Sequence, residues 1–247
     1  SMIWVLYYFL GGDSLLKIKR ENLILKIRII KQIFSIGMSP FAMQLASSLV
    51  NVILNRSLFI YGGDLAIGAM GIINSITTII FMPIFGINQG SQPVIGFNYG
   101  AKLYDRVKNA LKLAIIAATV ISTLGALCAY IFPYVLVGLF NKNDVNLTNI
   151  TVNGIKIFMA MFPILGFQIV SSNFFQAIAR AKISIFLSLS RQVIVLIPML
   201  LMLPRIFGLN GVWLAAPVSD GISSVLTAIF LFLEIKKLKT PGMSNLM

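Results

Sequence analysis

The sequence predicts an all-α integral membrane protein that folds as a six-helix transmembrane bundle, with the lipid bilayer as its surroundings. Three observations lead to this prediction. Hydrophobic residues make up 58% of the 247 residues and charged residues only 11%, whereas a soluble domain carries about 25% charged residues. Long apolar segments alternate with short polar turns, and cations gather in every second turn. So small a proportion of charged residues cannot cover a water-facing surface.

Six segments are long enough to span a bilayer, whose hydrocarbon core takes about 20 apolar residues per helix. Pro133 is expected to kink the third of them. The predicted spans cover residues 33–54, 65–97, 110–140, 152–179, 183–203 and 211–235. The predicted loops at 61–64, 141–144 and 204–211 contain the Gly, Asn, Asp and Pro residues typical of turns.

The two ends of the chain differ from this bundle. Residues 1–32 are expected to be the remnant of a preceding transmembrane helix followed by a basic cytoplasmic linker, because the apolar run is too short to span and six cations follow it. Residues 33–236 then form the six-helix lobe, and residues 237–247 a cytoplasmic tail. The chain is therefore expected to be a fragment of a longer protein.

The cations predict the orientation. Sixteen of the 20 lie on one side of the predicted bundle, and cytoplasmic loops carry the excess of Lys and Arg. Both ends of the segment are therefore predicted to face the cytoplasm, in the cell membrane. The same rule explains the net charge of +13. Because no basic patch is interleaved with aromatic residues, nucleic acid is not a predicted partner.

Several chemistries are excluded by composition. The chain has no histidine and a single cysteine, Cys128, which is predicted to be a small buried hydrophobe. No disulfide, zinc or haem site can be built, so neither a metal nor a cofactor is expected. An intramembrane enzyme would need paired carboxylates or a Ser–Lys pair, and Asp220 has no second acid beside it in the spans. The chain is therefore predicted not to be an enzyme.

Polar and aromatic residues recur on single helical faces inside the spans. Such stripes either form interhelical hydrogen bonds, worth about 0.6 kcal/mol each, or line a polar cavity near midmembrane, where transporters hold their substrates. For one residue the first interpretation remains open, but stripes on several helices together favour the cavity. The candidate cavity residues are Gln44, Ser48, Asn51, Phe81, Phe85, Asn88, Gln92, Gln168, Ser172 and Phe175.

Two charged residues lie away from the ends of the last two spans, Arg191 and Asp220. The spans are expected to be antiparallel neighbours, which places the two residues roughly 10 Å apart in depth at 1.5 Å of rise per residue. An intramembrane charge indicates function by default. A structural link between the two and a role in ion coupling are both left open.

Three stretches resemble a known family. The first is Pro83 to Ala101, which ends in Gly-Ser-Gln-Pro-Val-Ile-Gly-Phe-Asn-Tyr-Gly-Ala. The others are Arg-Gln-Val-Ile-Val-Leu-Ile-Pro over 191–198 and Gly-Leu-Asn-Gly-Val-Trp-Leu-Ala-Ala-Pro-Val-Ser-Asp over 208–220. In this order they resemble the multidrug and toxic compound extrusion (MATE) family, and within it the DinF-like bacterial branch. Gly86 and Gly90, within the first stretch, have the spacing of closely packed helices.

The resemblance implies a fold and a function. The six helices would be the C-terminal lobe of a twelve-helix, two-lobe transporter, whose N-terminal six-helix lobe is a missing partner. Family members are cation-coupled antiporters that export lipophilic cationic drugs and toxins by alternating access.

One departure concerns the coupling ion. Sodium-coupled relatives carry acids in the first and fourth helices of this lobe, where this chain has Gln44, Gln168 and Gln176. The resemblance therefore favours H⁺ over Na⁺, with the principal coupling acid in the other lobe.

The alternatives fit the residues less well. A flippase of a lipid-linked saccharide needs a strongly cationic cavity to hold pyrophosphate, and only Arg191 lies near the stripes. A channel would show charged rings or a repeated filter motif, and the sequence has neither. A non-transporting membrane domain would not need several polar stripes.

Overall fold

The computed structural model describes residues 7–8, 27–141 and 143–238. The chain separates into two compact units, Ser1–Ala42 and Met43–Met247. The predicted remnant and linker over 1–32 lie mostly outside the described residues, as does most of the predicted tail. Within the first unit, residues 7–8 and 27–42 are helical. The second unit holds the helical bundle.

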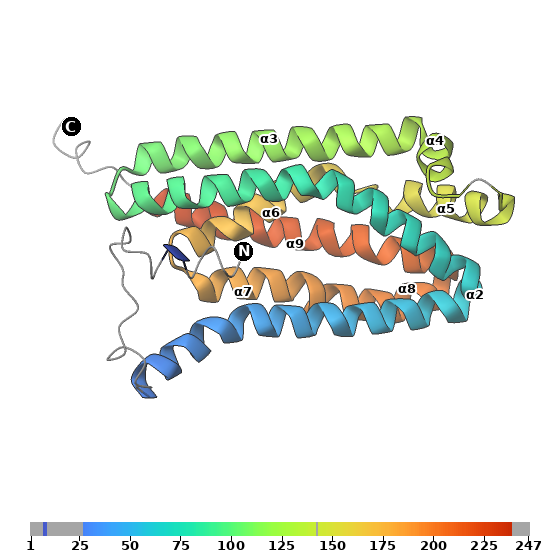
Figure 1. The fold of residues 1–247 in the computed structure, drawn as a ribbon, viewed down its shortest axis with the longest axis horizontal. Coiled ribbons are helices and arrows are strands. Elements are labelled where there is room, and N and C mark those ends of the chain that lie inside the picture. Colours follow the sequence, from blue (N-terminus) through green and yellow to red (C-terminus); the bar gives the residue numbers. More distant parts are fainter. Residues whose placement is uncertain (1–6, 9–26, 142, 239–247) are drawn as a thin grey trace. The chain divides into compact units, whose positions relative to one another are not determined.

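The first two predicted spans are the two arms of one long helix, α2 (Ile27–Gly100). The helix is interrupted at Gly63, whose φ of 65° and ψ of −161° lie outside helical values. A positive φ is open to glycine at little cost because it has no Cβ. The chain reverses here into two antiparallel arms (Figure 1). The turn predicted at 61–64 is thus confirmed.

The remaining elements follow in order. They are α3 (Tyr104–Ile131), α4 (Pro133–Gly138), α5 (Val145–Phe158), α6 (Phe162–Ala177), α7 (Ala181–Leu189), the π-helix η2 (Ser190–Leu196), α8 (Ile197–Phe207) and α9 (Leu209–Lys237). The predicted loop at 141–144 is confirmed, and the Asp144 side chain accepts a hydrogen bond from the backbone N–H of Leu147 to cap α5.

Three predicted features are corrected. The third span does not merely kink: α3 ends at Ile131, and Pro133 begins α4. The fourth span is not continuous, because α5 and α6 meet at an angle of 55°. The predicted loop at 204–211 is helical except at Gly208, whose φ of 57° separates α8 from α9.

The count of membrane-crossing helices agrees with the prediction once α2 is divided. In the described part of the chain, four helices are long and apolar enough to cross a membrane, and the bent pair α5 and α6 makes a fifth. One of the four helices is the segment Met43–Gly100, which contains both arms of α2 on either side of Gly63. Counting the arms separately gives the six predicted crossings.

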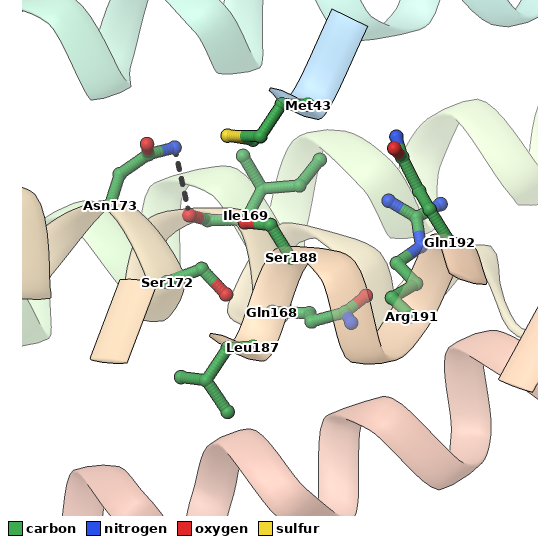
Figure 2. Close-up of a pocket in the computed structure, with 9 residues that line it drawn as sticks. All are labelled: Met43, Gln168, Ile169, Ser172, Asn173, Leu187, Ser188, Arg191 and Gln192. Atoms are coloured by element: carbon green, nitrogen blue, oxygen red, sulfur yellow. Dashed lines mark hydrogen bonds between the residues drawn. The ribbon is translucent and has the colours of Figure 1, made fainter. Parts of the chain in front are cut away.

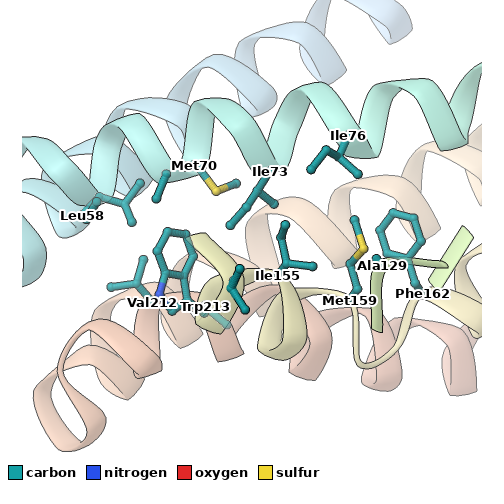
Figure 3. Close-up of a cluster of buried hydrophobic side chains, with 14 of the residues drawn as sticks. Leu58, Met70, Ile73, Ile76, Ala129, Ile155, Met159, Phe162, Val212 and Trp213 are labelled. Atoms are coloured by element: carbon teal, nitrogen blue, oxygen red, sulfur yellow. The ribbon is translucent and has the colours of Figure 1, made fainter. Parts of the chain in front are cut away.

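Two apolar clusters hold the bundle together. In the first, Met70, Ile73 and Ile76 of the second α2 arm pack toward α5 and α9 (Figure 3). The second cluster joins α3, α6, α7 and α9. At Gly166 a Cβ would collide with the backbone of Ala118, so this glycine lets α3 and α6 approach closely.

Other small residues face outward. Gly86 and Gly90 have no atom within 4 Å of a Cβ placed there in the described part of the chain, which corrects the prediction that they pack against a neighbour. Cys128 is exposed rather than buried. It lines an apolar hollow with Ile79 and Leu139, both exposed, as lipid-facing side chains are.

Candidate functional site

A polar cavity of about 130 Å³ lies between α6 and the α7–η2 segment, and Met43 of α2 completes its lining (Figure 2). Hydroxyl, amide and guanidinium groups face it from both helices. The lining residues are Met43, Gln168, Ile169, Ser172, Asn173, Leu187, Ser188, Arg191 and Gln192.

The π-helix η2 presents two of these residues, Arg191 and Gln192. Turns with i→i+5 hydrogen bonds are rare and occur mostly at functional sites. Pro198, at the start of α8, has no N–H to offer the preceding turn. The hydroxyl of Ser219 in α9 donates to the carbonyl oxygen of Arg191 over 2.7 Å. This contact fixes the widened turn against α9.

The predicted charge pair forms inside the bundle. Nε of Arg191 donates to Oδ1 of Asp220 over 2.6 Å. The Asp220 side chain is 6% exposed and that of Arg191 31%. The arginine therefore covers a buried carboxylate on one side and lines the polar cavity on the other.

Arg191 also borders a second, apolar cavity of about 130 Å³. Its lining comes from α2, α5, η2, α8 and α9, and consists of Val50, Leu54, Met70, Phe158, Leu196, Leu200, Val212, Trp213 and Ala216 beside Arg191. The charge pair thus lies between a polar and an apolar hollow.

The first arm of α2 is tied to the site by one hydrogen bond. The Ser47 hydroxyl donates to Oε1 of Gln192 over 3.1 Å. Sequence reasoning passed over Ser47, Gln192 and Met43. For Gln192 a signal existed, since it follows Arg191 in one of the family-like stretches, but nothing in the helical pattern separates Ser47 from its neighbour Ser48.

The structure divides the predicted cavity residues into groups. Gln168 and Ser172 line the polar cavity, and Gln168 is only 3% exposed. By contrast, Gln44, Ser48 and Asn51 are exposed along the first arm of α2. None of these three side chains has a hydrogen-bond partner among the described residues.

The stripe of the second arm is divided as well. Phe81 packs against Phe162 at 5.1 Å between ring centroids and against Phe85 at 6.1 Å. Phe85 is exposed, and Asn88 and Gln92 are half-buried. None of the four lines the polar cavity.

Phe175 corrects the prediction outright. Its side chain is fully buried in the second apolar cluster and stacks edge-on against Phe174 at 5.5 Å. It packs the lobe together rather than facing a cavity.

The bundle and its site define a class of protein. Membrane-crossing helices that enclose a charge pair beside a polar cavity form a polytopic membrane protein with an internal polar site. The MatE family model matches residues 40–201, and the chain belongs to that family. The DinF-like branch remains a prediction.

Curated relatives are similar over almost the whole chain. The Multidrug export protein MepA of Staphylococcus saprophyticus is 23% identical over 234 residues, which are 94% of this chain and 51% of the relative. The protein of the same name from Staphylococcus aureus strain N315 is 22% identical over 236 residues, with the same coverage. The chain thus spans about half the length of these relatives, which are transporters and not enzymes.

Solved structures agree with the fold. A structure of the MATE multidrug transporter DinF-BH, solved as a complex with a ligand, is 36% identical, with a TM-score of 0.80 over 94% of this chain and 52% of that chain. A MOP superfamily transporter from Pyrococcus furiosus has a TM-score of 0.83 at 20% identity, over 96% of this chain and 53% of that one. The second likeness concerns the fold alone.

Proposed function

We propose that this chain is the C-terminal lobe of an antiporter that exports lipophilic cations by alternating access, driven by H⁺. The lobe would lie in the cell membrane with both ends toward the cytoplasm, and a second six-helix lobe would complete it. The names of the relatives, multidrug export proteins and a MATE multidrug transporter, support this function. The choice of H⁺ over Na⁺ is supported by the glutamines at 44, 168 and 176, which stand where sodium-coupled relatives are expected to carry acids.

The observation that carries the proposal is the open polar face of α2. Gln44, Ser48 and Asn51 on the first arm, and Asn74 and Thr78 on the second, are exposed within membrane-crossing segments. Amides facing lipid are costly. Water or a second lobe must therefore cover this face in the membrane.

The volume of the polar cavity points the same way. At about 130 Å³ it is smaller than the ~300–1,000 Å³ that hold a drug-sized ligand. We infer that it is one half of a binding site whose other half comes from the second lobe.

The lining suits a lipophilic cation. The one cationic side chain, Arg191, is paired with Asp220, so the described lining carries no net charge. Phe85 lies outside this cavity but is exposed on α2, so its ring is free to contact a cation held between the two lobes, an attraction of about 0.5–2 kcal/mol.

The test is ethidium efflux from cells that express the complete transporter containing this lobe, with the proton and sodium gradients varied separately. We expect efflux that follows the proton gradient and ignores sodium. Efflux driven by sodium alone would overturn the choice of ion. No efflux of any lipophilic cation would overturn the drug-export function and favour the flippase. Residues 1–247 alone should show no transport in vesicles, and transport by them would contradict the two-lobe arrangement.

A further inference from the structure

The α7–η2 segment and α9 run antiparallel and touch at three levels. Nη1 of Arg180 lies 2.8 Å from Oε2 of Glu234. Further along, the rings of Phe186 and Phe230 have centroids 5.8 Å apart. The third level is the Arg191–Asp220 pair. At 1.5 Å per residue the two ion pairs lie about 20 Å apart along α9.

Three buried hydroxyl groups lie close in sequence to the Arg191–Asp220 pair. Ser223 and Ser224 follow Asp220 by three and four residues, which places them on its helical face, and Ser190 precedes Arg191. Each of these three serines is at most 5% exposed. None of their hydroxyls has a hydrogen-bond partner among the described residues.

Gln168 adds an acceptor that points to bound water. Its side chain is 97% buried and lines the polar cavity, and its Oε1 has no partner among the described residues. Buried polar atoms are almost always hydrogen-bonded. The cavity of about 130 Å³ has room for about four waters, and Gln168 and Arg191 both line it (Figure 2).

Apolar side chains lie between the two ion pairs. Leu187 and Leu231 are almost fully buried in the second apolar cluster, and each lies between the two ion pairs along its own segment. These two leucines separate the two ion pairs, and Arg191 links Asp220 to the polar cavity that it lines.

Asp220 faces a single charged group. Helix α6 carries no ionisable side chain. The charged side chains that α5, α7 and α8 contribute are exposed: Lys156, Lys182 and Arg205. Arg180 is paired with Glu234 at the far level. The guanidinium in contact opposes any added cation, but a proton bonds to one carboxylate oxygen and needs no further ligand. A metal cation needs several ligands, and the described residues contain no group of three or more His, Cys, Asp or Glu side chains that could hold one.

We infer that Asp220 is a proton-binding site of this lobe that sets the charge of the substrate cavity through Arg191. The inference rests on the proposed function and deepens it. A proton arriving through the cavity water bonds to a carboxylate oxygen of Asp220, and Arg191 keeps its charge. The pair changes from neutral to +1 while Arg191 still lines the cavity. A bound cation is then repelled and leaves.

The test measures equilibrium binding of ethidium to the complete transporter in lipid nanodiscs at pH 6 and pH 8. We expect binding to weaken about tenfold at the lower pH, the effect of one like charge roughly 10 Å away at a protein-like dielectric constant. Asp220→Asn leaves Arg191 unneutralised, so binding should be weak at both pH values. The double variant Arg191→Gln/Asp220→Asn has a neutral pair throughout, so binding should be strong and independent of pH.

The Arg180–Glu234 pair supplies the matched control. Arg180→Gln/Glu234→Gln removes an ion pair of the same helices outside the cavity, and it should keep the pH dependence of the unaltered protein. If the Arg191→Gln/Asp220→Asn protein still loses affinity at pH 6, or if Asp220→Asn binds as the unaltered protein does, the inference is wrong.

A second measurement does not require a cation to bind. Infrared difference spectra between pH 8 and pH 6 should contain the carbonyl band of a buried protonated carboxylic acid, and the band should vanish in Asp220→Asn. Absence of this band in the unaltered protein overturns the proton site. A band without any ethidium binding would instead overturn the proposed export of cations.

Discussion

Polar residues inside the membrane-crossing helices occur in two settings, and the contrast between them separates two roles. In the interior, Arg191 and Asp220 are paired and enclosed, and Gln168 is buried beside them. On α2, Gln44, Ser48 and Asn51 form a stripe that is exposed and has no hydrogen-bond partner in the described part of the chain. The interior groups are paired or enclosed within the lobe, whereas the stripe is exposed, and we propose that a second lobe or water covers it.

The largest expected effect is a loss of stability when the interior charge pair is broken, compared with a substitution at an exposed position. Arg191→Ala leaves the buried Asp220 carboxylate without a partner, and breaking a buried pair costs about 3–5 kcal/mol. The free energy of unfolding, measured with denaturant in detergent micelles, should fall by that amount. Arg56→Ala, at an exposed position of α2, should change it by less than about 0.5 kcal/mol. An equal loss of unfolding free energy in the two variants would contradict the prediction that the interior pair stabilises the lobe.

A second comparison uses glycines. Gly166→Ala forces a methyl group against the backbone of Ala118, and such overpacking costs about 1–3 kcal/mol. Gly86→Ala meets no atom of the described chain within 4 Å, and alanine is favoured over glycine in a helix by about 1 kcal/mol. Thermal melting should therefore show opposite shifts, and a matching loss for Gly86→Ala in this chain would mean that the open face is packed.

Ser47 and Ser48 are neighbours in sequence, but among the described residues only Ser47 is hydrogen-bonded to the interior site, so the pair tests the same contrast. Ser47→Ala removes the hydrogen bond to Gln192, which should cost about 0.5–1.5 kcal/mol of unfolding free energy. Ser48→Ala removes an exposed hydroxyl without a partner and should cost almost nothing. The same denaturant titration measures both, and the prediction fails if Ser48→Ala proves the more harmful of the two.

The smallest expected effect on stability falls on the stripe itself. Asn51→Leu and Asn74→Leu should change the unfolding free energy by less than about 0.5 kcal/mol, as exposed substitutions do. Ethidium efflux by the complete transporter should nevertheless fall, because both amides face the proposed shared cavity. Normal efflux from both variants would place the substrate elsewhere.

Much of the fold could be read from the residues. The apolar segments, the turn at Gly63 and the loop capped by Asp144 follow from length, hydropathy and turn chemistry, which are local properties. The Arg191–Asp220 pairing was within reach because two opposite charges in adjacent antiparallel spans have few other partners.

The site was only partly predictable. Gln168 and Ser172 line the polar cavity, but Phe175, on the same helical face as both, packs in the core. The pattern could not separate them, since a stripe gives a direction and not the neighbour that fills it. Met43 and Gln192 entered the lining only through the approach of three helices.

The sequence by itself determined that this is a membrane-crossing helical lobe, how many crossings it has and which family-like stretches it carries. Only the tertiary structure decided which polar residues are enclosed, where the fourth span bends and how η2 widens around Arg191. The reason is that the lipid and the interior of the lobe are equally apolar. Hydropathy therefore marks what lies in the membrane, and packing alone decides which side of each helix is the inside.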